Sequence, residues 1–168
     1  MDEVEALLNR MRTLEPQVHV YGPASDHIVR QLEAAFGHPM PPSYREFLGR
    51  FGGFYILNRS YSGIIDGKME KGRGWAWTDT KSAREQCRLP EHYLVVQHDG
   101  DGFKCLDFSQ TTPNGEHPVI YHMPFRKTPF HKMASSYGAW LIEDLQAMVE
   151  AWDDDDEQRV APDCGGIR

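Results

Sequence analysis

The start of the chain has the hydrophobic spacing of two amphipathic α-helices. Apolar residues recur every three or four positions over residues 4–14 and again over residues 28–36, and Gly37 follows the second run. This spacing places the apolar side chains on one face of a helix, and glycine is a residue that commonly ends one. We therefore predict two helices that each pack one apolar face against a core.

The segment MPPSYREFLGRFGG predicts a short third helix with signals at both ends. Ser43 stands three residues before Glu46, which is the spacing of a capping box at a helix N-terminus. Gly52 and Gly53 follow the last apolar residue and predict where the helix ends.

From residue 54 onward the pattern changes to short β-prone runs separated by glycine, asparagine and charged residues. The expected strands are residues 54–57, 61–65, 75–77, 93–97, 103–108 and 118–122. A short helix is expected across residues 78–87, and Ser135 or Ser136 is placed to cap a long final helix. Helices first, strands in the middle and a helix last predict an α+β domain with an antiparallel sheet of about six strands.

The stretch VVQHDGDGFKC carries two carboxylates, Asp99 and Asp101, and three interpretations have to be weighed: a calcium loop, a catalytic carboxylate pair and a turn. A calcium loop of the EF-hand type beginning at Asp99 would need glycine at its sixth position and glutamate at its twelfth. The chain has Lys104 and Gln110 there. Neighbouring residues at a hairpin tip also do not form the separated pair of acids that glycoside hydrolysis requires.

A tight turn between two strands fits the same stretch better. Gly100 and Gly102 can take the left-handed conformations that a chain reversal requires, and the neighbouring aspartates can bond to nearby amides. With Gly100-Asp101 as the central pair, Val96 faces Cys105, so that apolar residues lie opposite one another. We therefore predict a structural hairpin that binds no metal, and its carboxylates Asp99 and Asp101 are candidates for contact with a partner protein.

The negative charge is concentrated near one end of the chain. The net charge is -7 at pH 7, whereas residues 143–157 alone contribute -8, which leaves +1 for the rest. A run such as DDDDE opposes the dipole of a preceding helix, so we expect the helix to end near Trp152. We expect one domain over residues 1–152 and a disordered acidic tail over residues 153–168. Asp153 and Asp154 are candidates for contact with a basic partner, and a solvated tail without a role is the alternative.

The composition indicates a cytoplasmic globular protein. No apolar stretch approaches the roughly 20 residues of a membrane span, and the first ten residues are acidic and amphipathic, unlike a signal peptide. The three cysteines are odd in number and widely spaced, which argues against a disulfide framework.

Motifs for catalysis or cofactor binding are missing from the sequence. It contains no nucleophile elbow, P-loop or dinucleotide fingerprint. His117 and His122 flank an expected strand at odd spacing, so that their rings would point to opposite faces. We expect no enzyme activity, no cofactor and no metal.

Two aromatic features could serve recognition. Trp75 and Trp77 would lie on the same face of a short strand, although burial under the last helix is the alternative. The segment PFRKTPFHK interleaves Phe125 and Phe130 with basic residues, as a nucleic-acid-binding surface does. The body of the chain carries too little positive charge for such a module, so nucleic acid is the weaker hypothesis.

In order, the segments PPSYREFLGRFGG, LPEHYLVVQHDGDGFKCLDF, NGEHPVIYH and ASSYGAWLIEDL resemble successive blocks of the SUKH superfamily, the Syd/Smi/Knr-like domains. The resemblance covers residues 23–152 and implies helices packed on a strongly bent antiparallel sheet. It also implies the role most often assigned to bacterial members, which are immunity proteins that neutralise a polymorphic toxin. A fungal relative regulates cell-wall synthesis, so the fold alone does not decide the function. We expect a non-enzymatic module that binds a toxin domain, and a regulatory cell-wall interaction domain or a nucleic-acid-binding module is the alternative.

Overall fold

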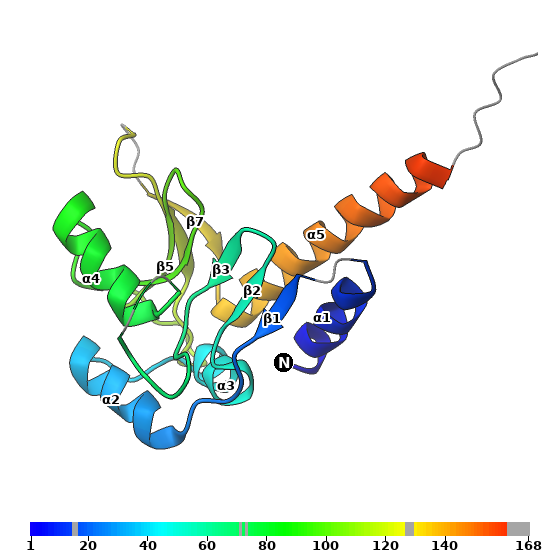
Figure 1. Cartoon of the computed structure of the whole chain (residues 1–168). Helices are drawn as coiled ribbons and strands as arrows, with labels where there is room; N and C mark the ends of the chain where they lie inside the picture. The colour runs from blue at the N-terminus through cyan, green and yellow to red at the C-terminus, as the bar shows by residue number, and fades with distance from the viewer. Residues whose placement is uncertain (15–16, 71, 73, 127–129, 161–168) are drawn as a thin grey trace, which may run out of the picture.

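The computed structural model describes residues 1–14, 17–70, 72, 74–126 and 130–160, with only the backbone described at residues 14 and 153–160. Within these residues the chain forms five α-helices and seven β-strands, which confirms the predicted α+β class (Figure 1). The helices are α1 (Asp2–Leu14), α2 (Asp26–Phe36), α3 (Pro42–Phe51), α4 (Ala76–Cys87) and α5 (Tyr137–Val160). The strands are β1 (Val18–Val20), β2 (Phe54–Ile56), β3 (Arg59–Tyr61), β4 (Tyr93–His98), β5 (Phe103–Asp107), β6 (Val119–His122) and β7 (Phe130–Ala134).

The strands form a single antiparallel sheet in the order β1-β2-β3-β4-β5-β6-β7, so that each pairs only with its neighbours in the chain. The predicted meander is confirmed, although the two edge strands, β1 and β7, were not expected. The expected strand at residues 61–65 was largely wrong, because β3 lies earlier and includes only Tyr61 of that run. The expected strand at residues 75–77 was also wrong, because Trp75 precedes α4 and Trp77 lies within it.

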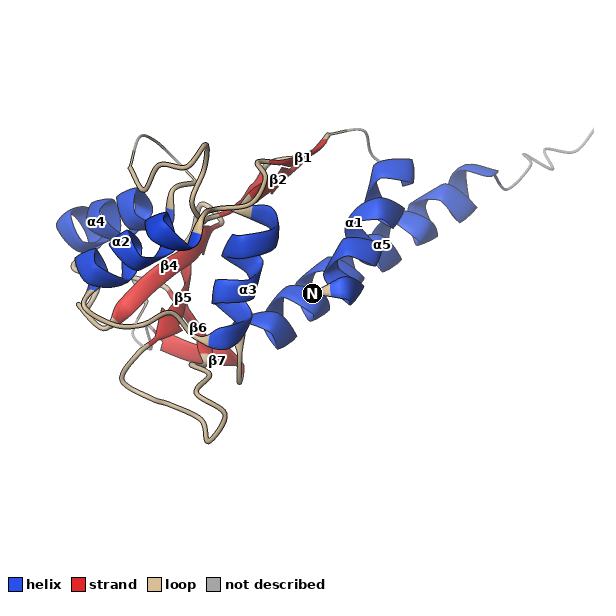
Figure 2. Ribbon diagram, turned by 90° about the horizontal axis from the view of Figure 1, so that it is seen from below, coloured by secondary structure: helices blue, strands red, loops and turns tan. Residues whose placement is uncertain are grey.

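Helices cover both faces of the sheet (Figure 2). Alternate residues of β4 point to opposite faces. Leu94 and Val96 belong to the large core that includes α1, α3 and α5, whereas Val95 packs in a smaller cluster with Ala83 of α4. Since both of its faces are covered, β4 is an almost continuous apolar strand.

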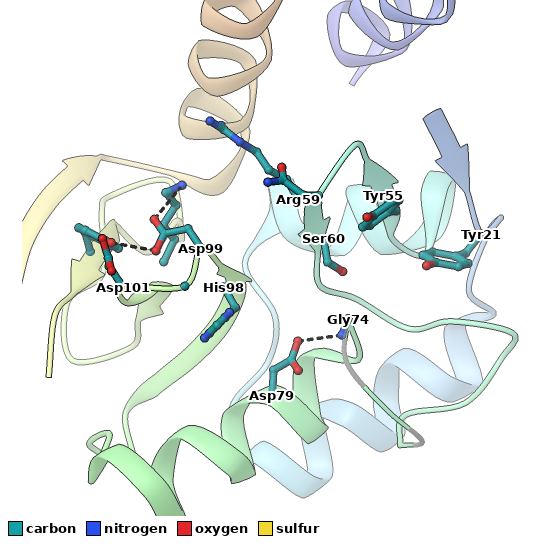
Figure 3. A pocket seen from close by; sticks show the side chains of 13 residues that line it. Tyr21, Tyr55, Arg59, Ser60, Gly74, Asp79, His98, Asp99 and Asp101 are labelled. Atoms are coloured by element: carbon teal, nitrogen blue, oxygen red, sulfur yellow. Dashed lines mark hydrogen bonds and ion pairs between the residues drawn. The ribbon is translucent and has the colours of Figure 1, made fainter. Parts of the chain in front are cut away.

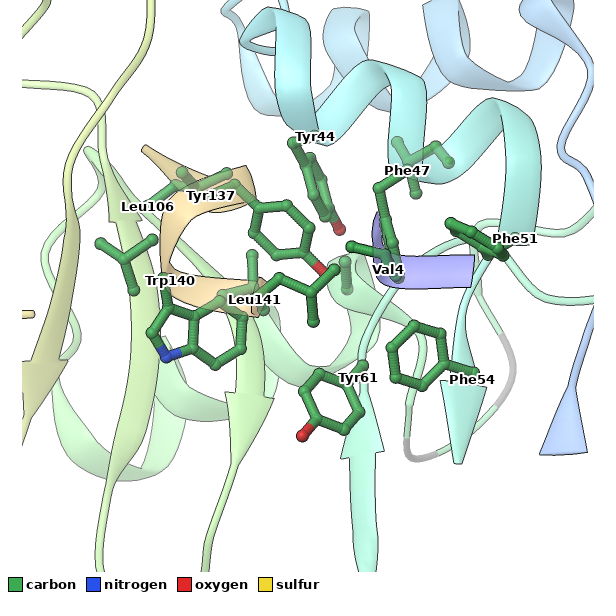
Figure 4. Close-up of a cluster of buried hydrophobic side chains, with 14 of the residues drawn as sticks. Val4, Tyr44, Phe47, Phe51, Phe54, Tyr61, Leu106, Tyr137, Trp140 and Leu141 are labelled. Atoms are coloured by element: carbon green, nitrogen blue, oxygen red, sulfur yellow. The ribbon is translucent and has the colours of Figure 1, made fainter. Parts of the chain in front are cut away.

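Aromatic side chains fill the centre of the large core (Figure 4). The fully buried ones are Tyr44, Phe47, Phe54, Tyr61, Tyr137 and Trp140. The Tyr44 and Tyr137 ring centroids are 4.7 Å apart in an edge-to-face arrangement, which joins α3 to α5. The Tyr44 hydroxyl donates a hydrogen bond to the Ser62 carbonyl at 2.9 Å, and burial raises the pKa of this phenol. This contact satisfies a polar group that would otherwise be costly inside the core.

The N-terminus of α3 is capped by a residue distant in the sequence, so the predicted capping box was wrong. The helix begins at Pro42, which puts Ser43 inside its first turn. The Glu116 carboxylate accepts hydrogen bonds from the Ser43 backbone amide at 2.8 Å and from its hydroxyl at 2.7 Å. Glu46 instead lies 3.7 Å from the Arg50 guanidinium. A carboxylate from the β5–β6 loop therefore satisfies an amide that the helix leaves unpaired. Gly52 ends α3 with a φ of 66°, as the Gly52-Gly53 pair predicted.

Helix α5 begins where the sequence predicted and ends later. The Ser136 hydroxyl accepts a hydrogen bond from the Ala139 amide at 3.2 Å and caps the helix. The expected end near Trp152 was wrong, because α5 continues to Val160. Aspartates are poor helix formers, but extending an existing helix gains one hydrogen bond for each residue fixed and avoids the cost of nucleation. Residues 161–168 lie outside the described part of the chain.

Candidate functional site

A polar cleft of about 900 Å³ lies between β2–β3, the start of α4 and the β4–β5 hairpin (Figure 3). Its lining is rich in tyrosine, aspartate and small polar side chains. The lining residues are Tyr21, Tyr55, Asn58, Arg59, Ser60, Gly74, Asp79, His98, Asp99, Gly100, Asp101, Lys104 and Tyr121. We call this feature the polar cleft.

Two tyrosines form one wall of the polar cleft. In β2, Phe54 and Ile56 are fully buried in the core, so Tyr55 between them points to the opposite face and is 37% exposed. Tyr21 directly follows β1, which pairs with β2 and brings the two phenols to the same wall. Partial burial, then the charges of Asp66 and Tyr55, raise the pKa of Tyr21. Both side chains present aromatic surface with a polar end.

The opposite wall is the turn of the β4–β5 hairpin. The Asp99 amide donates to the Gly102 carbonyl at 3.3 Å, which closes a turn with Gly100 and Asp101 at its centre. The Asp99 carboxylate accepts hydrogen bonds from the Gly102 amide at 3.1 Å and from the Tyr121 hydroxyl at 2.8 Å. Burial and the bond to Asp99 raise the pKa of Tyr121 to about 12. Asp99 therefore holds the turn against β6, and Asp101 beside it is exposed to solvent.

The chain turns at the DGDG stretch between β4 and β5 as predicted, with two corrections. Gly100 has a φ of 90°, whereas Gly102 is not left-handed. A side chain at Gly102 would instead place its Cβ 2.4 Å from the His122 carbonyl oxygen, so glycine is required there for close approach. The predicted pairing of Val96 with Cys105 was off by one residue, because a bulge between Val95 and Gln97 shifts the register.

An ionic network around the largely buried Lys104 side chain adjoins the polar cleft. The Lys104 side chain is 9% exposed, and its ammonium donates a hydrogen bond to the Gln97 side-chain oxygen. The ammonium lies 3.7 Å from the Asp99 carboxylate and 4.0 Å from that of Asp144 on α5. Asp144 also lies 3.5 Å from the Arg59 guanidinium. Among the described lining residues, the cations Lys104 and Arg59 are therefore already paired with protein carboxylates.

Asp79 joins the start of α4 to the cleft. Its carboxylate accepts hydrogen bonds from the Ser62 hydroxyl at 2.7 Å and from the Gly74 amide at 3.1 Å. These bonds hold the loop before α4 against the chain after β3. The Asp79 carboxylate therefore fixes the backbone at Gly74, which forms this edge of the cleft.

Of the predicted contact residues whose side chains the structure describes, Asp99 and Asp101 line the polar cleft, whereas Trp75 and Trp77 do not. Trp75 donates its indole N–H to the Ile65 carbonyl at 3.3 Å, and Trp77 makes an edge-to-face contact with Phe36 of α2. The shared strand face predicted for the two tryptophans was therefore wrong, and so was their alternative burial under α5, because Trp77 packs against α2.

The helix containing Asp153 and Asp154 extends beyond the core, and their side chains lie outside the described part of the structure. Their contact with a partner stays a prediction.

The sequence reasoning missed the tyrosine wall. Tyr55 had a usable signal, since it is the residue of the FYIL run that alternation directs away from the core. Tyr21 had none, because the three-residue strand that positions it is too short to recognise from its pattern.

The segment with interleaved aromatic and basic residues forms the edge of the sheet. Phe125 is 90% exposed in the β6–β7 loop, and Phe130 begins β7. Arg126 and Lys132 are exposed, and Lys127 lies outside the described residues. The described side chains of this segment lie beyond β6 and do not line the polar cleft.

The described residues contain no group of three or more histidine, cysteine, aspartate or glutamate side chains that could hold a metal ion. Cys105 is fully buried, and burial raises the pKa of its thiol. A thiol in this environment is a poor nucleophile. In the same part of the chain, no helix combines the length and hydropathy that crossing a membrane requires.

A sequential antiparallel sheet with helices on both faces and a polar cleft at one side defines an α+β domain. The sequence matches a family model over residues 4–146, and the chain belongs to that family, SUKH_5, described as SMI1-KNR4 cell-wall. The family is one of protein-interaction modules and is generally non-catalytic.

Among solved structures, the chain is similar to one described as the crystal structure of a protein from Pseudomonas syringae pv. tomato. The TM-score is 0.48 and the identity 14%, over 68% of this chain and 81% of that one. The search of curated proteins found no match.

Proposed function

We propose that the protein is a cytoplasmic immunity protein that binds a toxin domain and blocks it, with the polar cleft as the centre of the interface. The observation that carries this proposal is the cleft itself. It joins exposed aromatic surface at Tyr55 to an exposed carboxylate at Asp101 on a rigid sheet. Aromatic residues are enriched at binding hot spots, and a preorganised surface loses little entropy on binding.

The charge distribution supports a basic partner. The acidic residues 143–157 lie on α5, which projects beyond the sheet (Figure 1). Their field speeds the encounter with a positively charged partner, while contacts in the cleft determine how slowly the complex dissociates.

The experiment that tests this function uses the neighbouring genes. A toxin module encoded beside this gene would be expressed in bacteria with and without this protein, and growth would be measured. We expect growth to be restored by the wild type and lost again in a Tyr55→Ala/Asp101→Asn double variant. The control, Phe125→Ser, removes an exposed aromatic outside the cleft and should still protect. Failure of the wild-type protein to protect cells against any adjacent toxin would overturn the immunity role.

The rival functions have a direct readout. Phe125 and Arg126 are exposed on the β6–β7 loop, as a nucleic-acid contact would require. Fluorescence anisotropy with a labelled single-stranded oligonucleotide should show no binding at physiological salt, because the chain carries a net charge of -7. Micromolar binding that Phe125→Ser abolishes would favour the nucleic-acid module over the immunity protein.

Altered cell-wall composition in a deletion strain that lacks an adjacent toxin gene would favour the regulatory role.

A further inference from the structure

We propose that the polar cleft recognises an arginine side chain of the partner, whose guanidinium pairs with the Asp101 carboxylate while the adjoining partner chain lies over Tyr55 and Tyr21. This inference rests on the proposed function only in taking the cleft as the binding surface. It adds the chemistry of the group that is bound.

Among the described residues that line the cleft, the balance of charge favours a cation. Lys104 lies within 4.0 Å of both Asp99 and Asp144, and Arg59 lies 3.5 Å from Asp144. Neither cation is therefore available to attract an anion. Asp101, by contrast, is exposed and makes no ion pair with any described residue. An anionic ligand would meet this carboxylate unshielded, whereas a cationic ligand would neutralise it.

The shape and hydrogen-bonding capacity of the site favour arginine over lysine. The carboxylate of Asp101 can accept two parallel N–H···O bonds from a planar guanidinium, and an ammonium cannot form that pair. The two tyrosines on the opposite wall provide aromatic surface over which the adjoining partner chain can lie (Figure 3).

The cleft is also preorganised for this contact. Asp99 fixes the turn through bonds to the Gly102 amide and the Tyr121 hydroxyl, so the neighbouring Asp101 is presented from a rigid hairpin. Little ordering of the protein is needed when the ligand arrives, which preserves affinity.

The test is a nuclear magnetic resonance titration of ¹⁵N-labelled protein with N-acetyl-arginine methylamide. The neutral citrulline derivative of nearly the same shape is the matched ligand control. We expect the arginine compound to shift the amide signals of Gly100, Asp101 and Tyr55 in a saturable way, with affinity about tenfold or more above that of the citrulline compound. Asp101→Asn should remove that difference. Glu143→Gln, which makes the same change of charge on the exposed face of α5, should retain it.

Equal shifts with arginine and citrulline, or an unchanged preference in Asp101→Asn, would overturn the inference. Equal affinity for the lysine derivative would overturn the assignment to arginine. The result is independent of the growth experiment. Arginine binding without protection against a toxin would support this inference and contradict the immunity role, and protection that survives Asp101→Asn would do the reverse.

Discussion

The two glycines of the β4–β5 turn show how differently neighbouring residues of one type can act. Gly100 provides a backbone conformation that other residues adopt at a cost, and the space around it is open. Gly102 has an ordinary backbone conformation but lies where a Cβ would meet the β6 backbone. The first glycine allows the turn, and the second allows the hairpin to pack against β6.

We predict that Gly102→Ala destabilises the protein more than Gly100→Ala. The first change places a Cβ 2.4 Å from the His122 carbonyl oxygen and 3.0 Å from the Tyr121 ring. Relieving such contacts by moving backbone should cost about 2 kcal/mol or more. The second change strains only one residue, at about 1 kcal/mol. Urea unfolding would measure both.

Gly49→Ala is the matched control, because Gly49 lies on an exposed part of α3 with nothing within 4 Å of its Cβ position. It should stabilise the protein by about 0.5–1 kcal/mol. A Gly102→Ala variant as stable as the wild type would contradict the close-packing argument.

Between elements, the structure depends on side chains that cross from one segment to another. The Ser43 hydroxyl binds the Glu116 carboxylate and also accepts a hydrogen bond from the Gly138 amide at 3.1 Å. One hydroxyl thus connects the start of α3, the β5–β6 loop and the start of α5.

We predict that Glu116→Ala lowers the free energy of unfolding by about 1–2 kcal/mol, because it leaves the first turn of α3 without its cap. Glu46→Ala should cost less than about 0.5 kcal/mol, because the Glu46 side chain is 51% exposed and its ion pairs are screened by solvent. Chemical denaturation would measure the loss of stability in each variant. A larger loss for Glu46→Ala than for Glu116→Ala would support the capping box instead.

We predict a pH-dependent effect for Asp26→Asn. Asp26 of α2 accepts hydrogen bonds from Arg30 and Arg45, and these bonds lower the pKa of its carboxyl from the usual 3.8. A lowered pKa in the folded state means that the stabilisation is complete above about pH 4 and is lost as the pH falls through the folded-state value.

The thermal midpoint of Asp26→Asn should therefore lie below that of the wild type at pH 7, and the two should converge as the pH falls below the lowered folded-state pKa of Asp26. Added salt should reduce the gap at pH 7. A gap that persisted unchanged at low pH would show that the residue acts through something other than its charge.

The elements that the sequence predicted well are those with a strong local pattern. The helices α1, α2 and α3 and the apolar face of α5 follow from helical spacing, and the β4–β5 hairpin follows from its glycines between apolar runs. β7 could not be found in this way, because its first four residues, Phe130 to Met133, are all exposed and show no alternation. The WAW run has β-prone composition, but tertiary contacts place it at the beginning of a helix.

The candidate site was predictable only in part for a related reason. Asp99 and Asp101 lie in one recognisable turn, whereas the cleft requires Tyr21 and Tyr55, which come from separate strands. Likewise, nothing local to Ser43 indicates that its amide partner is Glu116, 73 residues later in the chain. Contacts between distant segments depend on the topology of the sheet and leave no periodic signal.

In the molecule as a whole, the acidic end of α5 extends beyond the packed core. The last α5 side chain packed against the core is that of Trp152, within the described residues. We therefore still propose a functional boundary near residue 152, with a helical rather than disordered segment immediately after it.

We predict that deletion of residues 153–168 leaves the thermal midpoint within a few degrees of the wild type, because no described core contact is removed. Far-ultraviolet circular dichroism should show a loss of helix corresponding to residues 153–160. Association with a basic partner should slow several-fold at low salt and converge with the wild-type rate at high salt. A tail that is wholly disordered would leave the helical signal unchanged, and equal association rates at all salt concentrations would exclude steering by this segment.

Helices α1 and α5 contact each other although they lie at opposite ends of the domain. The apolar side chains of Val4, Leu8 and Met11 are almost completely buried there. During synthesis α1 is made before α5, and at typical rates α5 follows on the order of 10 seconds later. Until then the apolar face of α1 stays exposed to chaperones and proteases. We therefore expect a chain truncated before α5 to be degraded, because the apolar face of α1 stays uncovered.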